Sequence, residues 1–175
     1  MKYLCKLAFC VIFFIVWFCY PVHSTENFGF GIILGEPVSG ISMKIWLNRP
    51  ALRGAMDTIF GTLNILGTGE KAIDFAVGLK SGDYLYFHTT LLNHSYNIIN
   101  TGDISGKMPV YWGSGFRYKK TGADVPAVGL KFSIGIEYLP ENVPIDVFAE
   151  LVPVFNITPK FQAEITAGFG VRYMF

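Results

Sequence analysis

A histidine stands directly before a serine in the segment Asn93-His94-Ser95. A histidine within hydrogen-bond reach of a serine hydroxyl can act as the base that turns this hydroxyl into a nucleophile. If the segment is a β-strand, however, the two side chains point to opposite faces of the sheet and could not readily share a proton. The same alternation directs His88 to the polar face of its strand, where it fits a polar core better than a reaction. The sequence therefore predicts that the chain is not an enzyme, and we assign no catalytic residue.

Charged side chains form the second group that could do chemistry. They recur at alternate positions of segments whose other positions are apolar, and the two signs are matched in number. If these faces are turned inward, the charges must be paired, because an isolated ion is strongly disfavoured away from water. We expect an ion-pair core that fills and closes the inside of the protein. The cations of this set are Lys44, Lys80, Arg117, Lys131 and Arg172, and the carboxylates are Asp74, Glu137, Asp146, Glu150 and Glu164.

Composition and motifs argue against cofactor, metal and nucleic-acid chemistry. The cysteines Cys5, Cys10 and Cys19 all lie in the N-terminal segment, so the remainder of the chain offers no thiolate for a metal or a disulfide. The sequence contains no phosphate-binding loop and no metal-ligand spacing. The formal net charge is +1, which gives no basic footprint for nucleic acid. We therefore expect neither a cofactor nor a nucleic-acid partner.

The N-terminal segment predicts export from the cytoplasm. Two lysines precede an unbroken apolar run from Leu7 to Tyr20, and a proline ends it. This is the pattern of a cleaved signal peptide, with acceptable residues for cleavage after Ser24. We predict a signal peptide at residues 1–24 and a single domain at residues 25–175.

The elements that would position these side chains are β-strands. From residue 28 onward, apolar residues alternate with polar residues or glycine at the period of two that marks a strand. Turn residues separate most of the alternating segments, and an even number of strands suits a closed barrel. Pro153 lacks the donor for a ladder hydrogen bond and predicts a bulge or a strand end at that position. The predicted strands are 28–34, 41–47, 73–80, 84–93, 110–118, 128–138, 145–156 and 161–175.

Composition indicates which face of these strands meets water. The chain is 51% hydrophobic and only 15% charged, whereas a soluble domain carries about 25% charged residues. The apolar faces are rich in large aromatic side chains, which would not fit together inside eight strands. We therefore predict an all-β fold, namely an eight-stranded antiparallel transmembrane β-barrel whose apolar face meets lipid. One amphipathic helix is predicted as an insertion at about residues 50–66, where apolar residues recur at helical spacing.

The last predicted strand ends in a motif that looks like the terminal-strand signal of outer-membrane proteins. Gly170, Tyr173 and Phe175 supply the glycine, the aromatic residue and the terminal aromatic residue of that signal. In such proteins the assembly machinery recognises the last strand, and its aromatic side chains lie at the membrane interface. The resemblance implies a location in the cell outer membrane, with barrel-assembly machinery and outer-membrane lipid as partners.

More broadly, the chain resembles small OmpA/OmpX-type barrels, and especially a group of spirochaete-like small outer-membrane proteins. The resemblance lies in residues 29–37, 40–44 and 144–153. It implies a structural or surface-interaction role, with host extracellular proteins as candidate partners and adhesion as one hypothesis. A narrow outer-membrane channel is the alternative. A lipid A-modifying barrel enzyme is less favoured, because the sequence lacks the deacylase pattern of histidine and serine two residues apart.

The lengths of the connecting segments bear on the adhesion hypothesis. If both chain ends lie in the periplasm, the long segments at 48–71 and 94–108 also face the periplasm. The short turns at 35–39 and 81–83 then face the outside. Typical outer-membrane barrels have the opposite arrangement, so an adhesin built on long external loops is not favoured.

Overall fold

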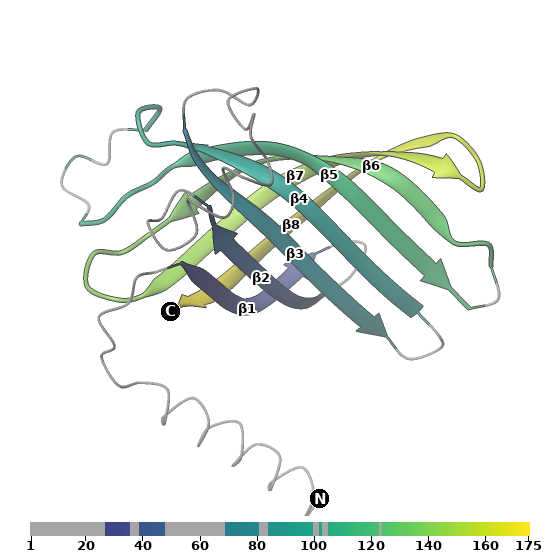
Figure 1. Ribbon diagram of the computed structural model, residues 1–175, viewed down its shortest axis with the longest axis horizontal. Coiled ribbons are helices and arrows are strands. Elements are labelled where there is room, and N and C mark those ends of the chain that lie inside the picture. The colour runs from purple at the N-terminus through teal and green to yellow at the C-terminus, as the bar shows by residue number, and fades with distance from the viewer. Residues whose placement is uncertain are drawn as a thin grey trace, which may run out of the picture.

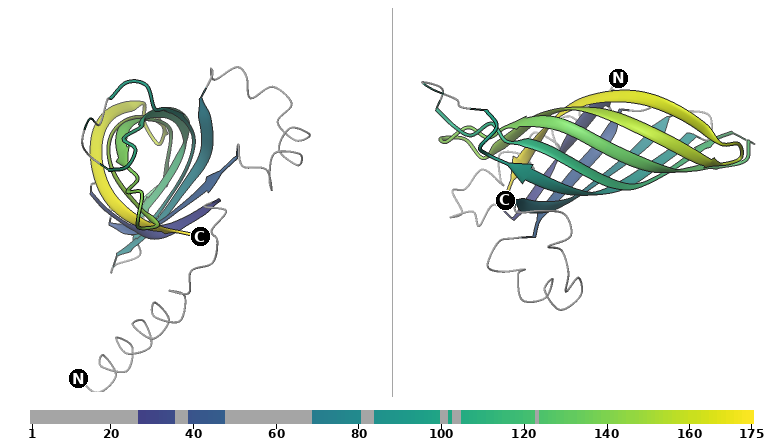
Figure 2. Two further views of the ribbon diagram at one scale, coloured as in Figure 1. Left: turned by 90° about the vertical axis from the view of Figure 1, so that its left-hand side faces the viewer. Right: turned by 90° about the horizontal axis from the view of Figure 1, so that it is seen from above.

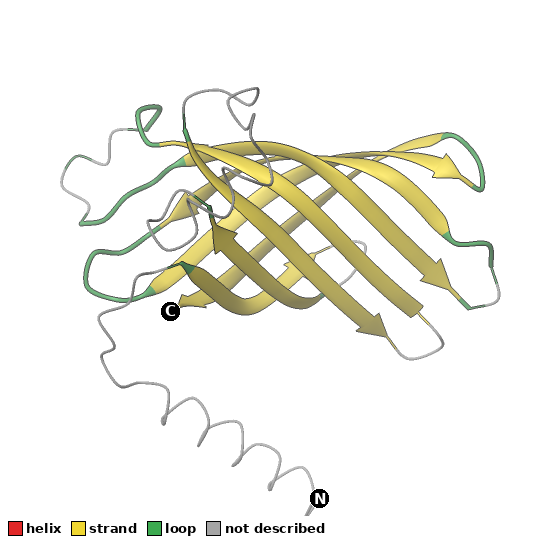
Figure 3. Ribbon diagram, in the orientation of Figure 1, coloured by secondary structure: helices red, strands yellow, loops and turns green. Residues whose placement is uncertain are grey.

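The computed structural model describes residues 27–35, 39–47, 69–80, 84–99, 102, 105–122 and 124–175. Eight antiparallel strands follow one another around a closed barrel in chain order, as predicted (Figures 1 and 2). Within the described residues, the secondary structure consists of strands connected by loops and turns (Figure 3). The strands are β1 (Phe28–Gly35), β2 (Gly40–Trp46), β3 (Glu70–Lys80), β4 (Tyr84–Ser95), β5 (Val110–Thr121), β6 (Ala127–Tyr138), β7 (Ile145–Thr158) and β8 (Gln162–Met174).

Two sequence predictions fall outside this part of the chain. The signal peptide at residues 1–24 and the amphipathic helix at residues 50–66 both lie outside the described residues. Within the described ranges, no helix has the length and the apolar character needed to cross a membrane.

The first and the last strand meet where the barrel closes. β1 pairs with the C-terminal half of β8, with Phe30 opposite Tyr173. The ring of the terminal Phe175 lies 6.1 Å from that of Phe28 and 4.9 Å from that of Tyr173. Aromatic rings at these separations attract each other. The aromatic end of the chain therefore stabilises the seam between the first and the last strand.

The apolar face of the strands points away from the barrel axis. Phe132, Ile134 and Phe169 keep 43%, 54% and 56% of their surface exposed. The residues that alternate with them along β6, such as Lys131 and Ser133, are buried. The outer wall is therefore largely apolar and the interior polar, as the alternation predicts. A soluble protein has the reverse arrangement, with an apolar interior and a polar surface.

Glycines on the inner wall allow the strands to approach closely. A Cβ atom added to Gly31 in β1 would overlap the carbonyl oxygen of Val171 and lie 2.6 Å from the Cα of Arg172, both in β8. Backbone atoms cannot give way as a side chain can. In contrast, a Cβ at Gly168 would meet the end of the Ile33 side chain at 3.3 Å.

We expect Gly31→Ala to lower the free energy of unfolding by about 1–3 kcal/mol, the cost of overpacking. The reason is that the new methyl group must push β1 away from β8 at the seam. Gly168→Ala is the matched control on the facing strand, and its cost is expected to stay below about 1 kcal/mol because the Ile33 side chain can move. Urea unfolding of the barrel in lipid vesicles measures both. Equal stability of the two variants would contradict the close approach.

The prediction of a bulge or strand end at Pro153 is wrong. β7 continues to Thr158, and Pro153 lies opposite Ile165 of β8 in an unbroken register. On the β6 side, Lys131 pairs with Val154 and Ile134 with Leu151 in the same register, but the two residue pairs between them, which include Pro153, are not formed. The missing N–H group removes hydrogen bonds to one neighbouring strand only, and β8 keeps the strand extended. The irregularity of β7 and β6 lies instead at Val128 and Gly129.

The connections divide between the two ends of the barrel. The end at which β1 begins and β8 finishes, on the left in Figure 1, also receives the junctions β2–β3, β4–β5 and β6–β7. There, Lys107 forms a β-bridge with Leu139, and the Tyr138 hydroxyl donates to the carbonyl of Ser105 at 2.7 Å. The opposite end, called the far end below, carries the junctions β1–β2, β3–β4, β5–β6 and β7–β8. The long and short connections are therefore distributed as the sequence predicts relative to the termini.

Candidate functional site

Arg172 of β8 lies in the barrel interior and contacts side chains of four strands, including Glu137 of β6 at 3.9 Å from Nη1. Its Nη1 atom donates to Asp146 Oδ2 of β7 at 3.0 Å, and its Nε atom donates to the Ser42 hydroxyl of β2 at 2.8 Å. Its Nη2 atom pairs with Asp74 of β3. The guanidinium also lies 3.8 Å from the centre of the Phe148 ring. Asp146 is the register partner of Arg172, so strand pairing alone positions this first ion pair.

Lys44 of β2 is the second buried cation of this interior. Its ammonium pairs with Glu137 of β6, on the opposite side of the lumen, and lies 3.8 Å from Asp146 Oδ2. It also lies 4.0 Å from the centre of the Trp46 ring, within range of a cation–π interaction. His94 completes this group, because its Nε2 atom is 3.4 Å from Glu137 Oε2. Lys44, Glu137 and His94 have almost no exposed surface.

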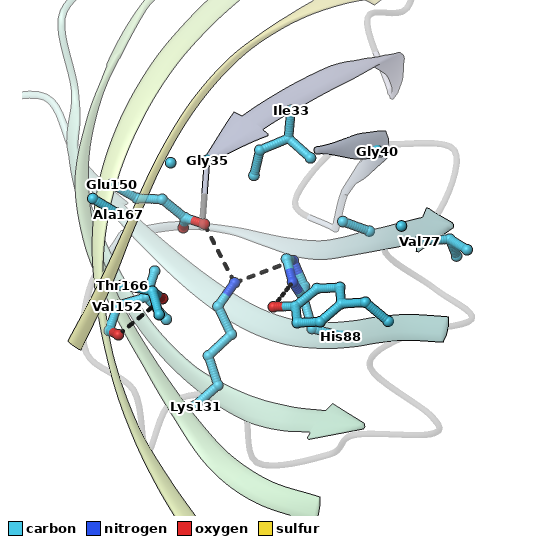
Figure 4. A pocket seen from close by; sticks show the side chains of 14 residues that line it. Ile33, Gly35, Gly40, Val77, His88, Lys131, Glu150, Val152, Thr166 and Ala167 are labelled. Carbon is cyan, nitrogen blue, oxygen red and sulfur yellow. Dashed lines mark hydrogen bonds and ion pairs between the residues drawn. The ribbon is translucent and has the colours of Figure 1, made fainter. Parts of the chain in front are cut away.

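Lys131 of β6 connects the network toward the far end. Its ammonium lies 3.1 Å from His88 Nε2 and 3.4 Å from Glu150 Oε1 (Figure 4). The His88 ring is also 3.0 Å from Asp74 Oδ2, and its Nδ1 atom is 3.0 Å from the Tyr86 hydroxyl. The central network thus defined consists of Lys44, Asp74, His88, His94, Lys131, Glu137, Asp146, Glu150 and Arg172.

A separate cluster lies nearer the far end. Arg117 of β5 pairs with Glu164 of β8 and donates through Nη2 to Asn156 Oδ1 of β7 at 2.7 Å. The Asn156 amide also donates to Glu164 Oε1 at 3.3 Å. Arg117, Asn156 and Glu164 are called the Arg117 cluster below.

The structure therefore brings nine of the ten charged residues of the predicted ion-pair core into the barrel interior, each in an ion pair. The tenth, Lys80, has a side chain outside the part that the structure describes. Buried pairs of this kind contribute little net stability, because desolvation offsets their attraction. Their main consequence is that removal of one partner leaves the other charge buried and uncompensated.

Aromatic rings also fill the interior, and the sequence interpretation missed two of them. Tyr111 is 2% exposed and Phe148 is 3% exposed. A Cβ at Gly135 would overlap the Tyr111 ring, and a Cβ at Gly170 would overlap the Phe148 ring. The alternation could have predicted the position of Phe148, because it lies between two acidic residues on the same face of β7. The facing glycines provide the room that the rings need.

The sequence also drew attention to His94 beside Ser95. His94 points into the interior, where its Nδ1 atom lies 3.2 Å from the Glu70 carbonyl oxygen and its ring lies 4.4 Å from that of Trp46, tilted by 49°. Ser95 follows on the other face of β4. In the described ranges, no three His, Cys, Asp or Glu residues are grouped so that they could hold a metal ion. The absence of catalysis stays a prediction.

Little free space remains beside Lys131 in the central network. The cavity lined by Tyr86, His88, Lys131 and Glu150, shown in Figure 4, has a water-accessible volume of about 20 Å³. This is room for about one water molecule. The central network therefore acts as a plug across the barrel.

Comparisons with known proteins give one structural likeness. No protein family and no curated protein sequence match the chain. Among solved structures, the chain is similar to the N-terminal β-barrel domain of Pseudomonas aeruginosa OprF, with a TM-score of 0.48 and 13% sequence identity. The match covers 85% of this chain and 95% of that domain.

Proposed function

We propose that the chain is an integral β-barrel of the outer membrane with a structural role and a closed interior. The observation that carries this proposal is the inverted distribution of polarity. Large apolar side chains cover the outside of the wall, whereas ionised side chains such as Arg172 and Lys44 are buried within it. A soluble monomer seldom exposes an apolar patch of more than a few hundred Å². Membrane hydrocarbon is the solvent that makes such a wall stable.

The strand lengths support a spanning position. β3 to β8 contain 11 to 14 residues each, and a tilted strand of about 9–11 residues crosses a bilayer. β1 and β2 contain 8 and 7 residues, so the apolar wall is lower on that side. Closure also supports the proposal, because a membrane-spanning sheet must satisfy all its backbone hydrogen bonds internally.

The proposal assigns the partners that the sequence suggests. Outer-membrane lipid covers the wall, and the assembly machinery recognises the last strand through Gly170, Tyr173 and Phe175. The end of the barrel at which β1 begins and β8 finishes faces the periplasm in this arrangement. The far end with its short turns then faces the outside.

Expression in a Gram-negative host tests the compartment and the barrel together. The protein is expected in the outer-membrane fraction, and its folded form should migrate differently on a gel before and after heating. Protease added to intact cells should cut only at the far end. Recovery of the processed protein as a soluble periplasmic species without detergent would overturn the proposal.

Because the interior is closed, we expect the barrel not to conduct ions. The purified barrel should produce no conductance steps in a planar lipid bilayer, because Arg172, Lys44 and Trp46 occupy the lumen at the level of the central network. A porin reconstituted in the same bilayers serves as the positive control. Discrete steps from the purified barrel would instead favour the alternative function, a narrow channel.

A surface-interaction role and lipid A modification remain hypotheses of lower rank. Binding of serum proteins to the refolded barrel would support the first, whereas uniformly absent binding leaves the structural role. A changed lipid A mass spectrum on overexpression would support the second. His94 and Ser95 give no support to a catalytic pair, because they lie on opposite faces of β4.

A further inference from the structure

One edge of β8 lacks a partner strand toward the far end of the barrel. The wall is closed where β1 pairs with β8, and the last pair of that ladder is Gly35 with Gly168. On the other side of β8, β7 continues to the pair of Asn156 with Gln162. Within the described residues, no strand therefore pairs with Gln162–Ala167 on the side that faces β1. This stretch is called the open edge below.

The backbone groups of alternate residues point out of the open edge. At the other end of β8, Phe175 exchanges backbone hydrogen bonds with Phe28 of β1, whereas the Met174 N–H donates to the carbonyl of the residue before β7. In an antiparallel sheet, the N–H and C=O of one residue face the same neighbour, and the neighbour alternates along the strand. The register of β8 with β7 is unbroken, so Ala163 and Ile165 face the β1 side, as Phe175 does. Each presents one donor and one acceptor at the open edge.

The side chains and the strand lengths leave room beside the open edge. Ile165 is 77% exposed, against 54% for Ile134, which has a partner strand on both sides. β1 and β2 are shorter than β8 (Figure 1), and the ladder between β2 and β3 reaches only the pair of Ile41 with Val77. Beyond the β1–β2 turn, β8 and β3 are thus about 14 Å apart, three strand spacings. This gap accepts an additional strand.

The open edge also lacks the features that keep natural edge strands unpaired. Such edges carry a lysine, a proline or a bulge, or are very short. Residues 162–167 contain neither lysine nor proline, and their register with β7 is regular. Their single charge, on Glu164, is engaged by Arg117 and Asn156 inside the barrel. The sequence of the open edge therefore does not discourage a further strand.

We propose that the open edge binds an extended peptide segment of a partner protein, which adds to β8 as a strand in the place where β1 has ended. The outward side chains of the segment lie beside Ile165 and are apolar, whereas its inward side chains lie beside Glu164 and Thr166 and are polar. Water or a lipid headgroup satisfies single groups at such an edge. Another backbone offers donors and acceptors at the matching spacing, and this is the basis of recognition by strand addition.

Fluorescence anisotropy of a labelled peptide tests the proposal on the processed barrel in detergent micelles. The probe is a short, end-blocked peptide of alternating threonine and valine, residues that favour strands, and empty micelles give the background. The wild-type barrel is expected to bind it. The same peptide N-methylated at every residue has no ladder donors and should bind at least about tenfold more weakly, as the loss of two hydrogen bonds implies.

A proline in the open edge gives the complementary test. Ile165→Pro removes an N–H that points away from β7, so the pairing with β7 is retained, and binding of the probe should fall at least about tenfold. Ile165→Val is the matched control, because it keeps both the N–H and an apolar outward side chain, and its binding should equal that of the wild type. Heat-modifiability on a gel verifies that both variants are folded. The comparison of the two peptides stands even if Ile165→Pro does not fold.

Unchanged binding by folded Ile165→Pro, or no binding of the unmethylated peptide by the wild type, would refute strand addition at the open edge. Analytical ultracentrifugation in the same micelles tests the other occupant, a second copy of the chain. The wild-type barrel is expected to be monomeric. A dimer that Ile165→Pro dissociates would assign the open edge to a second copy and would overturn the proposal. None of these results bears on the assignment of the barrel to the membrane.

Discussion

Replacement of Arg172 by methionine is expected to lower the free energy of unfolding by about 3–5 kcal/mol, the cost of removing one partner from a buried ion pair. Arg172 pairs with Asp74 and Asp146 inside a lumen from which water is almost excluded. Methionine fills much of the volume but leaves both carboxylates facing a nearly dry interior. Urea unfolding of the barrel in lipid vesicles, followed by tryptophan fluorescence, measures the loss.

A second substitution shows whether uncompensated charge is the cause. Adding Asp74→Asn to Arg172→Met removes one of the stranded carboxylates and keeps a polar side chain near His88. The double variant should recover at least about 1 kcal/mol, as coupled neighbours do. Lys120→Met, at an exposed position on the outside of β5, should change stability by no more than about 0.5 kcal/mol. A loss at Arg172 no larger than that at Lys120 would mean that the interior is hydrated.

Ile134→Arg is expected to destabilise the barrel by about 2–4 kcal/mol, the cost of an arginine near the middle of a bilayer. Ile134 is 54% exposed near the middle of β6, and its neighbours across the strands are Trp112 and Leu151. All three side chains lie on the outer wall. In water, an exposed isoleucine can be replaced by arginine at almost no cost, so the size of the loss reports the surrounding solvent.

Ile157 provides the matched control for this experiment. It is 56% exposed, almost the same as Ile134, but lies one residue before the end of β7, beside the far-end turn. The same change to arginine should cost only about 0–1 kcal/mol there, because the membrane interface tolerates charge. Both variants are compared by the same urea titration in vesicles. Two equally small losses would show that the wall faces water and would remove the basis for a membrane location.

The alternation of side chains predicted the strands and their faces correctly because it is a local property. Successive side chains of a strand must point to opposite sides, so the positions of Lys131, Phe132 and Ser133 follow from one another in any sheet. The same rule turns Phe132 outward and its two neighbours inward. Composition then indicated that the outward face meets lipid, which remains our proposal.

Pro153 shows where local reasoning failed. A proline disturbs only the neighbour toward which its nitrogen points, and the sequence does not say which strand that is. In the folded barrel that neighbour is β6, and the pairing with β8 holds the strand through to Thr158. Whether β7 continues through Pro153 therefore depends on both neighbouring strands, which the sequence around the proline does not reveal.

The sequence could likewise not predict which interior side chains pair with one another. Charge alternation indicated that Lys44 and Glu137 face inward, but their pairing joins residues 93 positions apart across the lumen. The contacts of Arg172 with Asp74 and of Arg117 with Asn156 arise in the same way. Periodicity specifies the direction of each side chain, whereas the curvature and register of the closed sheet set which inward side chains meet.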